Sequence, residues 1–260
     1  MDVLTPRTLD EALRLKAEQP GALPVQGGTD VLVALNFDRA RPEALLNLNE
    51  VEELRGWRRD GGDVRLGSGL TYTEAMQGEL ATVLPALAEA ARTVGSPQIR
   101  NRGTIGGNLG TASPAGDALP PLLVERAEVE CASVRGTRRI PLGEFVTGVK
   151  RNALEPDELI AAVVVRPSGL PQTFMKVGPR NAMVIAVVSL AVSAGDELRA
   201  SFGSASPRPV LVTAPRAEAD TFAERVVAAA SPIGDVRGTE GYRRHALRVL
   251  TERALKRVLA

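Results

Sequence analysis

The most unusual stretch of the chain is GSPQIRNRGTIGGNLGTASPAGDALPPLL, residues 95–123. Glycine, proline and serine recur through it, so it is too irregular for the interior of a sheet. Apolar residues at its ends argue against a simple linker, and its varied composition is not low-complexity. Long ordered loops without regular structure are usually functional. We therefore expect an ordered functional loop here.

The centre of this stretch is Gly103-Thr104-Ile105-Gly106-Gly107-Asn108, followed by Ser113 and Asp117. Two adjacent glycines let the backbone approach a ligand closely, because no Cβ atom intervenes. Asn108 offers an amide with a donor and an acceptor, and Ser113 offers a hydroxyl. Asp117 suits a ribose hydroxyl or a ring N–H. The alternative is a glycine-rich surface loop, but the length and the interleaved apolar residues favour a binding site.

A second diglycine motif, Val25-Gln26-Gly27-Gly28-Thr29-Asp30, lies near the N-terminus and continues into Val31 and Leu32. Successive N–H groups in such a loop form an anion-binding nest. The motif is neither a Walker loop nor GxGxxG, and alone it is a weak signal that fits a plain turn between strands better than a phosphate site. Two separated diglycine loops with backbone donors suit a ligand with two phosphates. They predict a dinucleotide site without a Rossmann fold.

The composition is that of an ordinary globular protein, and it narrows the function. The chain has 260 residues, 44% apolar and 24% charged, with a net charge of +1. The balanced charge and the 3% of aromatic residues weigh against nucleic acid binding. One cysteine, Cys131, cannot by itself hold an iron–sulfur cluster or a structural zinc site. We expect Cys131 to be a small buried apolar residue in a strand, and His245 to be exposed to solvent on a basic helix face. No signal peptide or apolar span is evident, which predicts a cytoplasmic protein without a membrane span.

The order of expected elements is mixed, and it indicates an α+β or mixed α/β fold. We expect a start signal and helix at 3–19, a strand at 63–70, and helices across 73–94 divided at Pro85. Trp57 is expected in the core or at an interface. Further expectations are strands at 127–134 and 159–165 and a boundary at 166–172. We also expect a hairpin at 183–204 with its turn at Gly195-Asp196, and helices at 214–230 and 239–258.

A third motif, Phe174-Met175-Lys176-Val177-Gly178-Pro179-Arg180, places two cations near a strand end. Lys176 and Arg180 would neutralise phosphate or favour electron density on a ring system. Taken alone, they fit a solvated strand edge better.

Together these motifs resemble the FAD-binding subunit of the molybdenum hydroxylases, a family that includes the medium subunit of carbon monoxide dehydrogenase and the flavin domain of xanthine dehydrogenase. The resemblance covers nearly the whole chain, and the middle motif is the most specific part. The residues that carry it are QGGTDVLVAL (26–35), residues 94–123, FMKVGPRNAMVIAVVSLAV (174–192) and IGDVRGTEGYRRHALRVLTERAL (233–255).

The resemblance implies a vanillyl-alcohol-oxidase-type (PCMH-type) FAD-binding domain at 1–167, with subdomains at about 1–57 and 58–167. It also implies a C-terminal α+β domain at 168–260, with a small antiparallel sheet and helices. FAD would lie between the subdomains.

The same resemblance assigns the cofactor contacts. Val25 to Leu32 and Thr104 to Asn108 match pyrophosphate-binding loops, and Asp117 matches a ribose or adenine-side contact. Ile160 matches an apolar flavin contact, and Lys176 matches a contact at the isoalloxazine end. Val94 stands where some relatives place an aromatic residue near the flavin.

By the same resemblance, a molybdopterin large subunit oxidises the substrate, an iron–sulfur small subunit relays electrons, and this chain passes them through FAD to NAD or another acceptor. A dimer of heterotrimers is expected. No residue is assigned a catalytic or metal-binding role, since flavin carries the redox chemistry. Two alternatives stay open: a self-sufficient FAD-dependent oxidoreductase of the same fold, and a FAD-free assembly subunit.

Overall fold

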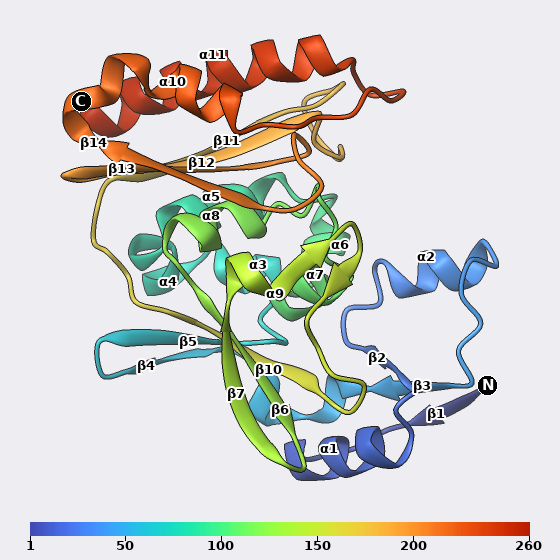
Figure 1. Cartoon of the computed structure of the whole chain (residues 1–260). Helices are drawn as coiled ribbons and strands as arrows, with labels where there is room; N and C mark the ends of the chain where they lie inside the picture. The colour runs from blue at the N-terminus through green and yellow to red at the C-terminus, as the bar shows by residue number, and fades with distance from the viewer.

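A five-stranded antiparallel sheet forms the middle of the molecule (Figure 1), in a computed structural model that describes residues 1–260. Its central strand, Leu159–Val165, reads LIAAVVV and is buried along its whole length. Leu159 and Ala161 pack into a cluster with α1 (Leu9–Glu18), whereas Ile160, Val163 and Val165 pack into the larger cluster on the other face of the sheet. Burial on both faces explains the unbroken apolar run. In order, the strands are β4 (Trp57–Asp60), β5 (Asp63–Gly67), β10 (Leu159–Val165), β6 (Glu128–Ser133) and β7 (Gly136–Pro141).

Short helices cover one face of this sheet and surround its main core. The expected break at Pro85 is confirmed, because this proline occupies the first turn of α5. The region 73–94 contains three helices where we expected two. The helices are α3 (Tyr72–Ala75), α4 (Gly78–Val83), α5 (Pro85–Thr93), α6 (Pro97–Arg100), α7 (Ile105–Thr111), α8 (Leu119–Val124) and α9 (Leu142–Phe145).

The expectation that 95–123 has no regular structure is wrong, because α6, α7 and α8 all lie within it. Ser96 and Thr104 cap α6 and α7: their hydroxyls accept from the N–H groups of Ile99 and Gly107. Proline in the first turn starts α6 and α8. Cap residues and first-turn prolines are ordinary helix signals. These signals were not recognised in the sequence because α7 contains three glycines, and glycine disfavours helix.

The N-terminal region is a separate layer, seen at the bottom of Figure 1. Its parallel sheet has the order β1 (Asp2–Leu4), β3 (Ala44–Asn47), β2 (Leu23–Val25), and α1 (Leu9–Glu18) packs near it. The expected start signal and helix at 3–19 are confirmed: Thr8 caps α1 by accepting from the N–H of Glu11, and residues 2–4 before the cap form β1. The helix α2 (Val31–Asn36) stands away from the body, and none of its side chains is buried. Two 3₁₀ turns, Leu48–Glu50 and Glu52–Leu54, follow β3.

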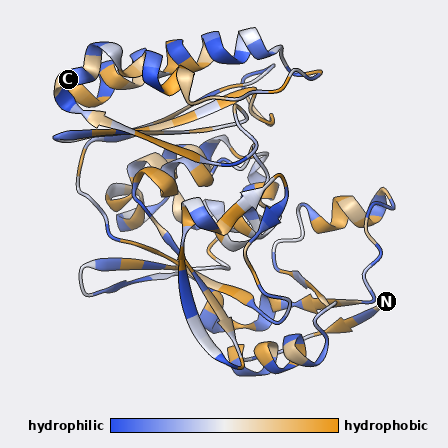
Figure 2. Ribbon diagram, in the orientation of Figure 1, coloured by the Kyte–Doolittle hydropathy of each residue, from blue (hydrophilic) through white to orange (hydrophobic).

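The C-terminal region contains a second antiparallel sheet between two pairs of helices (Figure 1). The predicted hairpin turn at Gly195-Asp196 is confirmed, but the strand β14 was missed, and its residues overlap the expected start of a helix at 214. The outer helices cover one face, and α5 and α8 lie against the other. Hydrophilic and hydrophobic residues alternate along α11, as a helix with one packed face requires (Figure 2). The elements are β11 (Gln172–Val177), β12 (Val188–Ala194), β13 (Glu197–Gly203), β14 (Val210–Pro215), α10 (Ala219–Ala228) and α11 (Glu240–Leu259).

Cys131, His245 and Trp57 each lie in surroundings of the kind that the sequence predicts. Cys131 is fully buried in β6, and burial raises the pKa of its thiol to about 12, so it behaves as a small apolar residue. His245 is exposed on α11, as expected, and Trp57 packs against the main core. A last small sheet pairs β8 (Val146–Gly148) with β9 (Arg151–Asn152). No helix combines the length and apolar character needed to cross a membrane.

Candidate functional site

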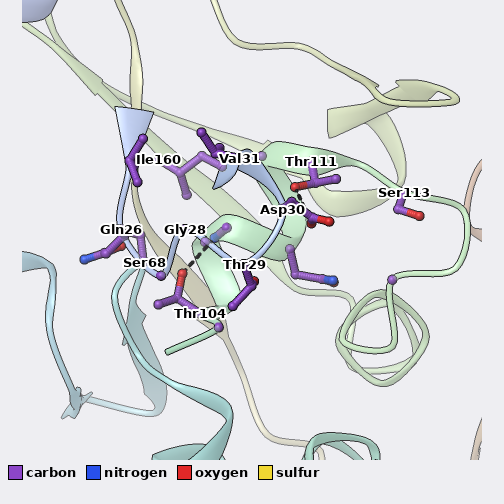
Figure 3. Close-up of a pocket in the computed structure, with 18 of the residues that line it drawn as sticks. Gln26, Gly28, Thr29, Asp30, Val31, Ser68, Thr104, Thr111, Ser113 and Ile160 are labelled. Carbon is purple, nitrogen blue, oxygen red and sulfur yellow. Dashed lines mark hydrogen bonds between the residues drawn. The ribbon is translucent and has the colours of Figure 1, made fainter. Parts of the chain in front are cut away.

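A cavity of about 660 Å³ lies where the loop after β2, the start of α7, the start of β10 and the β11–β12 loop meet (Figure 3). Its size is typical of small-molecule and cofactor sites, about 300–1,000 Å³. Most of the residues predicted from the sequence line it, although they come from segments far apart in the chain. These are Val25, Gln26, Gly27, Gly28, Thr29, Asp30, Val31, Val94, Gly103, Thr104, Gly106, Gly107, Asn108, Ser113, Asp117 and Ile160.

Three predicted residues do not line the cavity. Leu32 lies on α2 with 53% of its surface exposed, and Ile105 is fully buried in the main core. The ammonium of Lys176 lies 2.6 Å from a carboxylate oxygen of Asp117, behind the cavity wall. A direct cofactor contact from these three side chains therefore finds no support in the shape of the site.

One whole wall of the cavity was not predicted from the sequence. Met183, Val184 and Ile185 belong to the loop between β11 and β12, so the C-terminal region closes the site. Ser68 and Tyr72 follow β5, where the sequence Gly67-Ser68-Gly69 was a usable signal for close backbone packing. The other unpredicted lining residues are Leu23, Pro24, Leu48, Gly95, Ile99, Gly110, Thr111, Ala115, Gly116, Asn152, Leu154, Glu158 and Leu159.

The loop after β2 provides a row of free backbone donors. The N–H groups of residues 27–31 donate to no acceptor in the protein. Figure 3 shows this loop lying across the start of α7. Thr111 Oγ1 donates to Asp30 Oδ2 at 3.0 Å and ties the loop to the end of that helix. Consecutive unpaired N–H groups form an anion-binding concavity, so this loop is the strongest phosphate-binding candidate in the chain.

The two glycines of this loop have different roles. A Cβ atom on Gly27 would overlap the carbonyl oxygen of Arg102 and lie 2.7 Å from its carbon, so Gly27 lets two loops pack backbone against backbone. Gly28 has φ = 73°, a left-handed conformation that only glycine adopts at little cost. One glycine therefore joins the loops and the other bends the chain so that its donors converge.

The second diglycine motif forms the floor of the cavity. The N–H groups of Ile105 and Gly106 donate to the carbonyl oxygens of Leu70 and Ser68 at 2.9 and 2.8 Å. The N–H of Gly107 donates to the Thr104 hydroxyl at 3.0 Å. The expectation that both loops offer free backbone donors is therefore wrong for this motif. Its N–H groups hold α7 in place, and the positive end of the helix still faces the cavity region.

Buried polar atoms without protein partners lie among the lining residues. They are Ser68 Oγ, Asn108 Oδ1 and Asp117 Oδ1. Buried polar groups are normally hydrogen-bonded, so each orphaned atom needs a partner. A hydroxyl-rich ligand would satisfy all three. The site thus combines donors for an anion with acceptors for hydroxyl groups.

Electrostatics around Asp117 are set by burial and by Lys176. Burial raises the pKa of Asp117, and the ammonium of Lys176 opposes that rise. Burial also raises the pKa of Tyr72, so its hydroxyl stays neutral at physiological pH. Val94 and Ile160 contribute apolar surface to the cavity.

These features define a nucleotide-binding protein, because phosphate, sugar and ring portions of one ligand find matching groups. Free backbone N–H groups suit a diphosphate, orphaned acceptors suit ribose or ribityl hydroxyls, and apolar side chains suit a planar ring. The strands lack the parallel doubly wound order of a Rossmann fold.

Comparison with known proteins agrees with this class. The family described as FAD binding domain in molybdopterin dehydrogenase matches residues 1–167. The xanthine dehydrogenase FAD-binding subunit of Escherichia coli is 31% identical, covering 97% of this chain and 94% of that protein. The carbon monoxide dehydrogenase medium chain of Afipia carboxidovorans is 29% identical, over 100% of this chain and 96% of that protein. A carbon monoxide dehydrogenase structure from Hydrogenophaga pseudoflava aligns with a TM-score of 0.92 at 25% identity, over 100% of this chain and 97% of that one.

The chain therefore belongs to the FAD-binding domain family of the molybdopterin dehydrogenases. It is an FAD-binding oxidoreductase subunit of the xanthine dehydrogenase and carbon monoxide dehydrogenase type, with the fold of those flavin subunits. The residues of the cavity suit this cofactor: free N–H groups at 27–31 are the kind of donor that a diphosphate requires, and the orphaned oxygens are acceptors of the kind that ligand hydroxyls require.

The left-handed backbone of Gly28 gives a direct test of the loop. Alanine at Gly28 is expected to cost roughly 1–2 kcal/mol of conformational energy and to weaken FAD binding about tenfold, because relaxation would turn the donors away. Gly61→Ala is a matched control: Gly61 has φ = 61° in the β4–β5 turn, with nothing near its Cβ position. Both variants should lose similar stability in urea denaturation. Equal FAD dissociation constants for the two would refute the role of this loop.

Proposed function

We propose that this chain is the electron-transferring subunit of a molybdenum hydroxylase complex, receiving electrons from an iron–sulfur subunit and passing them to NAD or another acceptor. The observation that carries the proposal is the cavity, which matches a diphosphate-bearing cofactor in a chain of the FAD-binding family. The printed names of the relatives, "FAD-binding subunit" and "medium chain", support a place within a larger enzyme.

Bound flavin would supply the reversible uptake and release of electrons. The chain's own contribution is to bind and orient. Residues 27–31 would hold the diphosphate through backbone N–H groups, and Asp117 and Asn108 would accept from hydroxyls. Val94 and Ile160, with the loop that carries Met183, would exclude water from the ring end. No side chain needs to act as a general acid or base.

We further propose the partners and the domain division. The partners are an iron–sulfur small subunit and a molybdopterin large subunit, assembled as a dimer of heterotrimers. The flavin-binding domain would comprise 1–167, with subdomains near 1–57 and 58–167, and the second domain 168–260. The change of sheet between β10 and β11 and the separate hydrophobic clusters support this division.

Reverse electron flow tests the proposal. The complex purified with its iron–sulfur and molybdopterin subunits is mixed with NADH, or with a quinol in a parallel arm, and cluster reduction is followed by electron paramagnetic resonance. We expect flavin bleaching and cluster reduction in at least one arm, and loss of both when the complex is rebuilt with FAD-free chain. Equal cluster reduction without FAD would favour an assembly subunit. Oxidation of the complex's organic substrate by the isolated FAD-loaded chain would favour a self-sufficient oxidoreductase.

A further inference from the structure

The strand β11 connects the C-terminal sheet to the flavin-binding helices. Gln172, Phe174 and Lys176 share one face of this strand, since alternate residues of a strand point the same way. Phe174 is buried in a small cluster with Ala86 and Ala90 of α5. This face of β11 is therefore part of the contact surface between the two parts of the chain, which α8 extends across β12 and β13.

Three carboxylates of the flavin-binding part receive hydrogen bonds from β11. Glu125 accepts from Gln172 Nε2 at 2.9 Å, and Glu89 accepts from the backbone N–H of Phe174 at 2.7 Å. The third is Asp117, whose Oδ2 accepts from Lys176 Nζ at 2.6 Å. Hydrogen bonds to charged acceptors are stronger than neutral ones, so these contacts fasten the strand at three points.

The contact between Lys176 and Asp117 differs from the other two because Asp117 also belongs to the cavity wall. Asp117 lines the cavity, and its Oδ1 is buried without a partner. Lys176 lies outside the lining, only 6% of its side chain is exposed, and its ammonium also donates to the carbonyl oxygen of Thr93 at 3.2 Å. In this lining residue, one carboxylate oxygen is thus held by the C-terminal sheet, and the other is buried without a partner in the protein.

We propose that Lys176 is a positioning residue for the cofactor: it acts through Asp117, and it couples FAD binding to the docking of the C-terminal sheet. This inference rests on the cavity being the flavin site. The ammonium holds the carboxylate in one orientation and in its charged form, so that Oδ1 is a fixed acceptor for a hydroxyl or N–H of the ligand.

Removal of one partner from a buried ion pair leaves an uncompensated charge, which is strongly unfavourable. Without Lys176, Asp117 would rotate or take up a proton, and the acceptor seen by the ligand would change. Coupling between two events is reciprocal. A ligand that orders Asp117 must therefore also favour the bound position of Lys176 and of β11.

A double-mutant cycle separates this indirect role from direct contact. FAD dissociation constants are measured by titration of the full chain for the wild type, Lys176→Met, Asp117→Asn and the double variant. We expect Lys176→Met to weaken binding about tenfold in the wild type and less than about twofold in the Asp117→Asn background. Equal losses in both backgrounds would overturn the proposal, because a lysine that touches FAD itself does not need the carboxylate.

Two further variants check that folding alone does not explain the result. Lys176→Arg keeps the charge and should restore most of the affinity. Thr173→Val removes a hydroxyl that donates to Glu89 at 2.8 Å and leaves Asp117 intact, so it should keep wild-type affinity. FAD should slow amide hydrogen exchange along β11 in the wild type and in Thr173→Val, but not in Lys176→Met. If the wild-type chain binds FAD and the affinity losses of Lys176→Met and Asp117→Asn simply add in the double variant, the positioning role is rejected. The proposed function would still stand in that case.

Discussion

Replacing Gly106 by alanine is expected to disrupt the floor of the cavity, whereas the same change at Gly107 leaves the protein folded. A Cβ atom on Gly106 would overlap the side chain of Ser68 and lie 2.7 Å from its carbonyl oxygen. That oxygen also accepts the N–H of Gly106, so the backbone cannot retreat without losing the bond. A Cβ on Gly107 meets only the hydroxyl of Thr104, at 3.0 Å.

Overpacking of this kind costs about 1–3 kcal/mol, and the lost hydrogen bond adds about 1 kcal/mol more. We expect Gly106→Ala to lose roughly this amount in urea denaturation of the FAD-free chain. Gly107→Ala should lose less than about 1 kcal/mol. FAD titration of the same samples should show a large loss of affinity for Gly106→Ala. Similar stabilities for the two variants would mean that α7 does not rest on Ser68 as the structure shows.

Loss of the buried guanidinium of Arg243 is the second large effect expected. Arg243 lies in α11, is 1% exposed, and donates to the carbonyl oxygens of Val187 and Ser204 at 2.6 and 2.7 Å. It also contacts Asp235 Oδ1 at 2.6 Å. The side chain thus ties the start of β12, the end of β13 and the loop before α11 together. Arg243→Met would leave the carbonyl oxygens of Val187 and Ser204 without this donor, whereas Asp235 would keep its hydrogen bonds from Arg237. Each unsatisfied buried acceptor costs about 1–3 kcal/mol, so we expect a loss of about 2–6 kcal/mol.

The neighbouring residue offers a matched control. Arg244 is half-buried, and it makes one bond, to the carbonyl oxygen of Val227 at 3.2 Å. Arg244→Met should therefore change the free energy of unfolding by less than about 1 kcal/mol. Denaturation of both variants in parallel checks the prediction. A small loss for Arg243→Met would show that solvent replaces its contacts.

The pH dependence of this tie follows from Asp235. Burial opposes ionisation of Asp235, but the backbone N–H of Arg237 and the guanidinium groups of Arg237 and Arg243 outweigh it and lower its pKa to about 2. A carboxyl with a lowered pKa contributes stability above its unfolded pKa of 3.8 and loses it as the pH falls toward 2. The destabilisation of Arg243→Met should thus be full at neutral pH and shrink below about pH 4.

Much of the fold could be predicted from the sequence where the pattern was local. The run LIAAVVV at 159–165 and the turn at Gly195-Asp196 identified a buried strand and a hairpin, since burial and turn geometry depend on neighbouring residues. The strand 210–215 was missed because it reads as a continuation of the loop before α10. The helices within 95–123 were missed because α7 contains three glycines, and only packing against Ser68 explains them.

The residues of the site were easier to predict than their roles. Glycine pairs at 27–28 and 106–107 pointed to close backbone approach, and most of the predicted residues line the cavity. The sequence could not show which backbone segments the glycines contact, because these segments lie far away along the chain. Gly27 packs against Arg102, and Gly106 packs against Ser68. The Met183 wall was missed because it depends on where the second sheet docks. The burial of Lys176 beside Asp117 was not predicted for the same reason.

The unpaired N–H groups of residues 27–31 also have a consequence for ligand selectivity. Because the protein supplies no competing acceptor, an arriving phosphate displaces only water there, and affinity depends on how well that water is replaced. Backbone donors do not distinguish one diphosphate from another. Discrimination between FAD and other dinucleotides must therefore come from other parts of the lining, among them the apolar surface around Ile160 and the carboxylate of Asp117.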